Sequence, residues 1–237
     1  MNKKFYLLAV MIYLVVPISK SFASEGSTYY NFSWLDPDKE VYVLQNRKYR
    51  KKSRVYLTFG GGITTSGAFV TAQNGQGRLG YFFSESFGVE LLYSANFGST
   101  NSTFDAVKAL RVVPLYRRTK NYFGGMLLWS PFYSKINTFN IVMYYDWVFG
   151  LGAARTQEEN NRLEFLNNGG NHNKQVEDHT GVMWNTHIRW YLSKLVALRM
   201  DLTAIHYKVQ KAGFRTLETK KTWNDNFDLT ASLQFSF

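Results

Sequence analysis

The 237-residue chain contains no cysteine. This absence excludes a disulfide framework, a Cys-ligated metal or iron–sulfur site and a Cys nucleophile. Proline is scarce, with 4 residues against 18 glycines, while 45% of the residues are hydrophobic. The chain also lacks the run of about 18 or more apolar residues that a membrane-spanning helix needs. A disulfide-rich scaffold, a disordered chain and a helical membrane protein are therefore all disfavoured.

Aromatic residues are abundant instead, at 17% of the chain, and the formal net charge is high, at +11. At the N-terminus, Lys3 and Lys4 precede an apolar stretch that ends at Pro17, and Ser21-Phe22-Ala23 supplies small residues for cleavage. We predict a signal peptide over residues 1–23, and disfavour an uncleaved anchor. Cleavage removes three lysines and leaves a net charge of +8. Export argues against nucleic acid as a partner.

Alternation of apolar and polar residues dominates the rest of the chain and is clearest at its end. Between Trp223 and Phe237, seven of the eight odd positions are apolar and no even position is. A period of two indicates a strand with one apolar and one polar face. Similar patterns predict eight strands, at about 54–65, 71–83, 87–98, 121–131, 138–154, 181–192, 196–209 and 223–237.

The predicted connections alternate in length. Links at 84–86, 131–137 and 193–195 are short, whereas 99–120, 155–180 and 210–222 are long and polar. This pattern is typical of outer-membrane barrels, whose short turns face the periplasm. We predict an all-β fold: an eight-stranded antiparallel transmembrane β-barrel over 54–237, an up-and-down meander with both termini periplasmic. Residues 24–53 form a periplasmic N-terminal segment.

Aromatic residues gather at the short-turn ends of these strands, where a periplasmic girdle is expected. A soluble sandwich or lipocalin-like barrel also alternates, but its exterior would need more Lys and Glu. The bulky, nearly uncharged face therefore favours lipid contact. The expected girdle comprises Tyr81, Phe83, Phe87, Trp129, Phe132, Tyr133, Trp190, Tyr191, Phe235 and Phe237.

The last strand resembles the assembly signal of bacterial outer-membrane barrels. It ends in an aromatic residue preceded by apolar residues at alternate positions: Leu229, Ala231, Leu233, Phe235 and Phe237. The resemblance implies recognition by the barrel-assembly machinery and location in the outer membrane of a Gram-negative bacterium.

Several short segments resemble the myxobacterial-type outer-membrane β-barrel domain family, a group of small OmpA-like barrels. They are Tyr42-Val43-Leu44-Gln45-Asn46-Arg47, Trp129-Ser130-Pro131-Phe132-Tyr133-Ser134-Lys135, Asp146, and Gly150-Leu151-Gly152-Ala153. The family pattern has Gly at the position of Ser134, so that turn is expected to differ locally. The resemblance implies fold and location, and only by analogy a role in an envelope or motility complex.

The polar faces place a nearly balanced set of ionisable residues in the lumen: Arg78, Glu90, Asp146, His187, Arg189, Arg199, Asp201 and Asp228. Buried charges persist when they are paired, and a barrel this small is filled by side chains. We therefore favour a structural network over a gated pore or a proton-linked site at His187.

The register of the last short turn has two alternatives. If Leu192 opposes Val196, then His187 opposes Asp201 and Arg189 opposes Arg199, so both arginines need acidic neighbours. A shift of two residues would instead place Arg189 opposite Asp201.

Two basic sets suit membrane surfaces. On the periplasmic side, cations are expected to contact phospholipid headgroups or to form a solvated leader; they are Arg47, Lys48, Arg50, Lys51, Lys52 and Arg54. At the outer rim, cations suit lipopolysaccharide phosphates; they are Lys108, Arg111, Arg117, Arg118, Lys120, Lys208, Lys211, Arg215, Lys220 and Lys221.

No catalytic or metal site is predicted. No nucleophile lies at suitable spacing from the histidines, which are His172, His179, His187 and His206. His172, Asp178 and His179 form a loose metal-ligating set in a loop that reads as polar surface. We expect no cofactor. The sequence predicts a non-enzymatic structural or adaptor barrel with outer-membrane lipid, lipopolysaccharide and a periplasmic or surface protein as partners. A small or gated pore is the alternative, and a lipid-modifying enzyme is third.

Overall fold

The computed structural model describes residues 47–65, 67–138, 141–166, 174–210 and 221–237. Within it, Tyr49–Phe237 form one compact unit. The expected signal peptide over 1–23 and most of the expected periplasmic segment lie outside the described residues, so both stay predictions.

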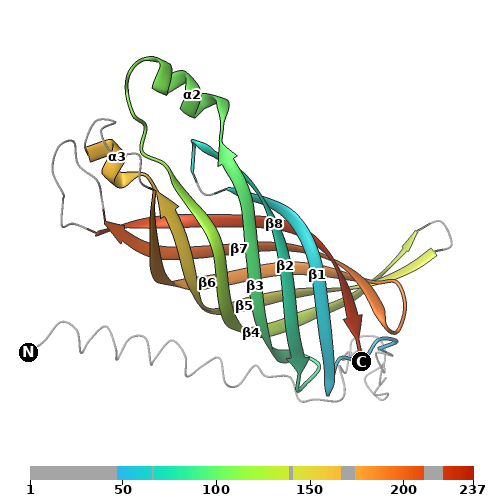
Figure 1. Cartoon of the computed structure of the whole chain (residues 1–237). Helices are drawn as coiled ribbons and strands as arrows, with labels where there is room; N and C mark the ends of the chain where they lie inside the picture. Colours follow the sequence, from blue (N-terminus) through green and yellow to red (C-terminus); the bar gives the residue numbers. More distant parts are fainter. Residues whose placement is uncertain (1–46, 66, 139–140, 167–173, 211–220) are drawn as a thin grey trace, which may run out of the picture. The chain divides into compact units, whose positions relative to one another are not determined.

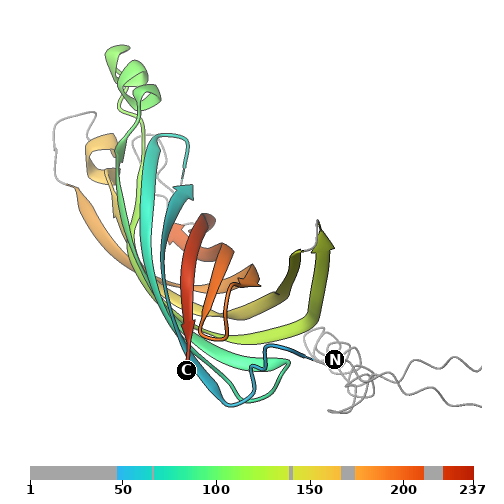
Figure 2. The ribbon, with the colours of Figure 1, turned by 90° about the vertical axis from the view of Figure 1, so that its right-hand side faces the viewer.

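Eight antiparallel strands follow one another around a closed barrel, in which β1 also pairs with β8 (Figure 1). The sheet curves round from β1 to β8 in the side view of Figure 2. This arrangement confirms the predicted eight-stranded meander. The strands are β1 (Arg54–Thr65), β2 (Val70–Phe82), β3 (Phe87–Thr100), β4 (Arg117–Thr138), β5 (Ile141–Asn160), β6 (Gln175–Tyr191), β7 (Val196–Gln210) and β8 (Lys221–Ser236).

Apolar side chains cover the outside of the barrel and polar ones fill it. Along β8, Phe227, Leu229 and Leu233 are exposed, while the intervening Asp228, Thr230 and Gln234 are buried. This is the inverse of a soluble barrel, and it agrees with the predicted assignment of faces. All five residues of the expected assembly signal lie on the outer face; their recognition stays a prediction.

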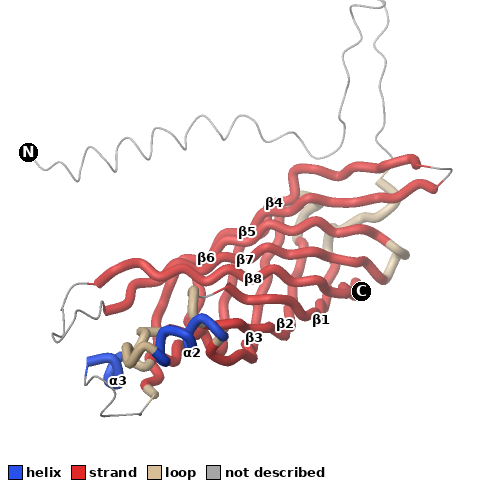
Figure 3. The backbone as a smooth tube through the Cα atoms, turned by 90° about the horizontal axis from the view of Figure 1, so that it is seen from above, coloured by secondary structure: helices blue, strands red, loops and turns tan. Residues whose placement is uncertain are grey.

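The β4–β5 hairpin differs most from the sequence prediction. Residues 131–137, expected to be a short link, belong to β4, which has 22 residues. Pairing with β3 ends at Trp129, opposite Phe87, and a bulge between Trp129 and Phe132 contains Pro131. Proline has no backbone N–H to donate. It is tolerated here because β3 no longer pairs with this part of β4, so no hydrogen bond of the sheet is lost. The hairpin therefore projects past the neighbouring turns (Figures 1 and 3).

Two helices lie at the opposite end of the barrel from the projecting ends of β4 and β5 (Figure 3). They are α2 (Ser102–Ala109) and α3 (Arg162–Leu166). Asn101 caps α2 by accepting a hydrogen bond from the Phe104 N–H, and the Phe104 ring packs on Tyr116. None of the described helices is long and apolar enough to cross a membrane.

Close approach of β1 to β8 closes the ring. A Cβ atom on Gly62 would collide with the Leu229 carbonyl and the Thr230 backbone on β8. The Gly60-Gly61-Gly62 run thus allows two strands from opposite ends of the barrel sequence to pair tightly.

Candidate functional site: the charged lumen

Four ionised side chains form the centre of the lumen. Glu90 on β3 accepts from Arg78 Nη1 at 2.8 Å and from Arg199 Nη1 and Nη2 at 2.6 and 3.0 Å. Arg199 also binds Asp201, with its Nε 2.9 Å from both carboxylate oxygens. The Tyr56 hydroxyl donates to Glu90 at 2.5 Å. Two arginines are thus matched by two carboxylates in a closed, hydrogen-bonded set.

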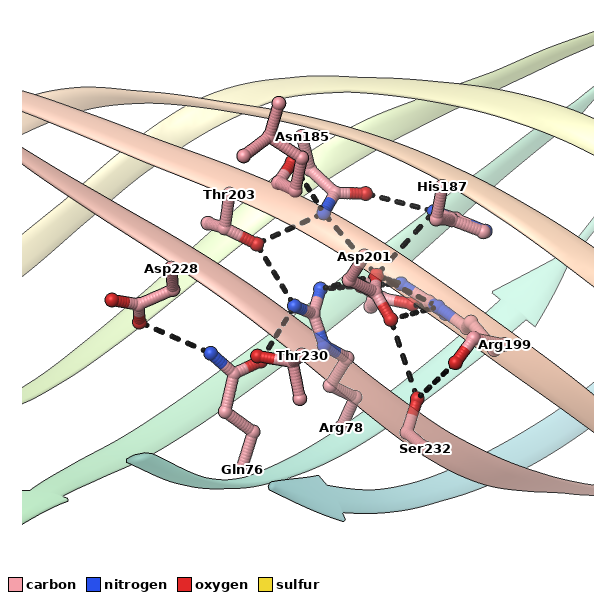
Figure 4. Close-up of polar contacts among 12 residues, drawn as sticks. Gln76, Arg78, Asn185, His187, Arg199, Asp201, Thr203, Asp228, Thr230 and Ser232 are labelled. Carbon is pink, nitrogen blue, oxygen red and sulfur yellow. Dashed lines mark hydrogen bonds and ion pairs between the residues drawn. The ribbon is translucent and has the colours of Figure 1, made fainter. Parts of the chain in front are cut away.

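Neutral groups complete this set on the β6–β8 side (Figure 4). Asn185 donates to Asp201 at 3.2 Å and to Thr203 at 2.9 Å, and Ser232 donates to Asp201 at 3.3 Å. His187 Nδ1 lies 2.8 Å from Asn185 Oδ1, an acceptor, so this ring nitrogen carries a proton.

The structure has the first of the two registers considered for the β6–β7 turn: His187 opposes Asp201, and Arg189 opposes Arg199. The two arginines escape repulsion because each turns to its own acidic neighbours. Arg189 Nη2 lies 2.6 Å from Asp146, while Arg199 takes Glu90 and Asp201.

Asp228 is held separately, toward the helix-bearing end of the strands. Its carboxylate accepts from the Tyr122 hydroxyl at 2.6 Å, from Gln76 at 3.1 Å and from Asn226 at 3.0 Å. No cation contacts it directly within the described part of the chain. Three donors satisfy its oxygens instead.

Lys51 enters the lumen at the short-turn end. Its Nζ lies 3.0 Å from Asp146 and donates to Ser130 Oγ at 2.6 Å, and only 4% of Lys51 is exposed. Its backbone N–H, like that of Lys52, reaches the Glu85 carboxylate at 3.2 Å. Lys51 therefore closes the mouth of the barrel from within the preceding segment.

Aromatic rings surround this mouth. Tyr49 stacks on Tyr191 with ring centroids 4.6 Å apart, and the Tyr191 hydroxyl donates to Asp146 at 2.6 Å. The Arg189 guanidinium lies over the Phe82 ring at 5.2 Å. We use the name mouth clip for Tyr49 and Lys51 together with the residues that they contact, namely Glu85, Ser130, Asp146 and Tyr191.

Lys51 also balances the luminal charge. The sequence placed three arginines and four carboxylates in the lumen, and all eight predicted residues, His187 included, are at most 3% exposed. Lys51 adds a fourth cation to this set and so matches its four carboxylates; Glu158 at the outer mouth is a further buried carboxylate, paired with Arg117. No sequence pattern separates Lys51 from its neighbours. Arg47, Lys48, Arg50 and Lys52 are basic as well, but none of them is buried.

The basic periplasmic cluster is therefore not one surface. Lys51 points inside, and Arg54 donates to the Lys194 carbonyl at 3.3 Å. Lipid contact by the other members stays a prediction.

The outer mouth has its own ion pairs. Glu158, fully buried, accepts from Arg117 at 2.5 Å and from the Tyr207 hydroxyl at 2.8 Å. Arg118 contacts Glu159 at 3.2 Å and the Gly98 carbonyl. These two arginines, expected in the lipopolysaccharide-binding set, hold the strand ends together, and lipopolysaccharide binding by them stays a prediction.

A small cavity of about 140 Å³ lies beside Arg118, lined also by Tyr116, Glu159 and Lys174. Burial raises the pKa of the Tyr116 hydroxyl above its ordinary value. Lys174 Nζ lies 3.5 Å from Glu159, so the carboxylate already neutralises part of the positive charge here.

The remaining rim cations differ in placement. Lys108 lies over the Phe104 ring and Lys208 over the Trp223 ring. Lys120 is half-buried, whereas Arg111 and Lys221 are exposed. Lys211, Arg215 and Lys220 lie outside the described residues, so lipopolysaccharide binding by this set stays a prediction.

The histidines are dispersed. His179 stacks on Tyr207, His187 lies in the lumen and His206 on the outer face. His172 lies outside the described residues. No group of three or more His, Cys, Asp or Glu side chains with metal-binding geometry occurs in the part of the chain that the structure describes.

Gly80 offers a first test of the network. A Cβ atom at Gly80 would collide with the ring and hydroxyl of Tyr56, its cross-strand partner, which is hydrogen-bonded to Glu90. We expect Gly80→Ala to lower the free energy of unfolding by about 1–3 kcal/mol, the usual cost of overpacking. Urea unfolding in lipid vesicles measures it. Gly77→Ala is the matched control because its Cβ would lie 4.0 Å from the Phe59 ring; equal effects would contradict the explanation.

A scan against models of protein families finds no match, and no curated protein matches the chain. Among solved structures, the chain is similar to the N-terminal β-barrel domain of Pseudomonas aeruginosa OprF, with 12% identity, a TM-score of 0.47, and coverage of 78% of this chain and 98% of that chain. It is also similar to the attachment invasion locus protein Ail of Yersinia pestis, with 8% identity, a TM-score of 0.46 and coverage of 78% and 99%. The outer membrane protein OprG of Pseudomonas aeruginosa is similar too, with 10% identity, a TM-score of 0.44, and coverage of 81% of this chain and 99% of that chain. Likenesses this distant bear on fold at most, so the closed barrel rests on its own strand register.

Proposed function

We propose that the protein is a non-enzymatic outer-membrane β-barrel with a closed lumen, serving as a structural or adaptor element of a Gram-negative cell envelope. The observation that carries the proposal is the luminal network. Its charged side chains are buried from the Lys51 end to the Glu158 end, and all of them are ion-paired except Asp228, which accepts hydrogen bonds from neutral donors. A lumen occupied in this way supports a rigid anchor more than a conduit.

The outer surface supports insertion in a bilayer. From Phe227 to Phe237, the outward-facing positions of β8 are apolar, about the ten residues that a tilted strand needs to cross a membrane. Short turns are periplasmic in such barrels, which supports a periplasmic position for Lys51 and Phe237.

The projecting β4–β5 hairpin supports the adaptor role. Phe132 pairs with Trp147 and Ile136 with Met143 on one face, and all four side chains are exposed. Lys135 and Asp146 lie on the other face. Ile136 and Met143 lie beyond the last residues that pair with β3 and β6, and an exposed apolar surface there is typical of a site that meets a partner.

Conductance tests the closed lumen. We expect the purified barrel to give no steady ion current in a planar bilayer under conditions in which it is folded, because paired buried charges block the path. The Asp178→Ala variant, altered in an exposed ion pair outside the lumen, serves as a control. A steady current that changes on replacing Arg189 or Asp201 would contradict the proposal and favour the alternative, a small or gated pore.

Membership of the myxobacterial-type family, a motility complex and recognition by the assembly machinery stay predictions. Altered lipid A on overexpression would favour the third alternative, a lipid-modifying enzyme.

A further inference from the structure

Three adjacent strands carry a polar chain on the outer face of the barrel, where apolar side chains otherwise prevail. Trp184 on β6 donates its indole N–H to His206 Nε2 on β7 at 2.9 Å. His206 Nδ1 lies 2.6 Å from Asp225 Oδ1 on β8. The sheet fixes the position of this hydrogen-bonded series, since His206 and Asp225 are direct cross-strand partners.

Hydrogen-bond roles along this chain are determined by the donor at one end. An indole nitrogen only donates, so His206 Nε2 accepts and holds no proton. His206 therefore donates from Nδ1 to Asp225. The result is an oriented carboxylate on the outer face with one oxygen still able to accept, and Asp225 is 49% exposed.

A second pair of outward-facing residues lies two positions along β7 and β8, nearer the outer ends of these strands. Lys208 and Trp223 are cross-strand partners, and the Lys208 ammonium lies 5.0 Å from the centre of the Trp223 ring. Trp223 is 59% exposed, so most of its surface remains available. The pair presents an aromatic platform next to a cation.

Below these residues the surface becomes purely apolar. Phe227 packs edge-on against His206, with Leu229 next on the same strand and Leu202 beside Leu229 on β7. We call Trp184, His206, Lys208, Trp223 and Asp225 the outer patch. It lies at the border between the apolar belt and the polar strand ends, the depth at which lipid headgroups begin.

We propose that the outer patch binds a phosphorylated glycolipid of the outer leaflet. This inference rests on the proposed outer-membrane location. An acyl chain lies along Phe227 and Leu229, a sugar ring stacks on Trp223, and a phosphate pairs with Lys208. The Asp225 carboxylate repels phosphate but accepts from sugar hydroxyl or amide groups. A ligand with both sugar donors and phosphate therefore fits better than a phospholipid, which lacks the sugar.

Lipid retention tests the patch. The full-length protein is folded in vesicles of phosphatidylethanolamine containing either lipid A or phosphatidylglycerol, extracted in mild detergent and weighed by native mass spectrometry. We expect one lipid A to be retained per barrel. The Lys208→Gln/Trp223→Leu variant should retain it about tenfold less well, because a charge-assisted contact and ring stacking are both lost. Asp225→Asn should weaken retention of lipid A but not of phosphatidylglycerol.

Arg155→Gln is the matched control, since Arg155 forms an exposed ion pair with Asp178 on β5 and β6 outside the patch. Equal retention by all variants, equal retention of phosphatidylglycerol, or full displacement by millimolar inorganic phosphate would each overturn the proposal. Failure of the wild-type chain to insert into vesicles would instead count against the proposed function, so the two failures are distinguishable.

Discussion

Replacing Glu90 by alanine is expected to lower the free energy of unfolding by about 3–5 kcal/mol, because removal of one partner leaves buried charge uncompensated. Arg78 and Arg199 both bind this carboxylate, and neither is more than 3% exposed. Asp201 alone would then face two guanidinium groups. Urea unfolding in lipid vesicles, followed by tryptophan fluorescence and by the heat-dependent gel shift of folded barrels, measures the loss.

Two variants make this result interpretable. Glu90→Gln keeps the shape but not the charge, so it should also be strongly destabilising. Asp178→Ala breaks an exposed pair with Arg155, which is worth about 0–1 kcal/mol. If Glu90→Ala lowers the free energy of unfolding no more than Asp178→Ala does, water enters the lumen and the closed luminal network is wrong.

Replacing Asp146 by alanine is expected to release the mouth clip. Asp146 binds Lys51, Arg189 and Tyr191, so its loss removes the ionic partner of two buried cations. If the clip loses about 3 kcal/mol of stabilisation, its open state becomes about a hundredfold more populated. Trypsin cleavage after Arg50, Lys51 and Lys52 should rise accordingly, read as a shift of the N-terminal residue of the resistant core.

The matched comparison is Lys51→Met, which removes the cation but leaves the Asp146–Arg189 pair intact. It should free the clip while costing the barrel less stability than Asp146→Ala. Cleavage after Arg50 and Lys52 at the wild-type rate in both variants would show that Lys51 does not hold this segment.

Alternation predicts only what the membrane imposes. On β8 every second residue meets lipid, so the pattern is unbroken and the strand was found to within two residues at either end. On β4 the prediction covers only the central part, because bulges next to Thr119 and at Pro131 interrupt the alternation and the flanking Arg117–Lys120 and Phe132–Thr138 do not pair with β3. The outer parts of β5 and β6, up to Asn160 and from Gln175, carry mostly polar side chains on both faces, so alternation gives no signal there.

The luminal residues could be found from the face they occupy, but their partners could not. Arg189 and Asp146 are 43 residues apart, and Arg199 and Glu90 are 109 apart. Such pairs depend on the stagger of strands around the ring, which a one-strand pattern does not contain. Lys51 lies outside any strand, so its position in the lumen had no signal at all.

By itself, the sequence predicts the number of strands, the apolar face of most of them and eight of the ionisable side chains inside, because a bilayer and a small lumen impose a period of two on a strand that crosses. Only the tertiary structure decided which charges pair, that Lys51 supplies the missing cation, that the β4–β5 hairpin projects, and that His206, Asp225 and Trp184 meet on the outer face. Those outcomes depend on register and on backbone that leaves the membrane, where alternation no longer constrains the chain.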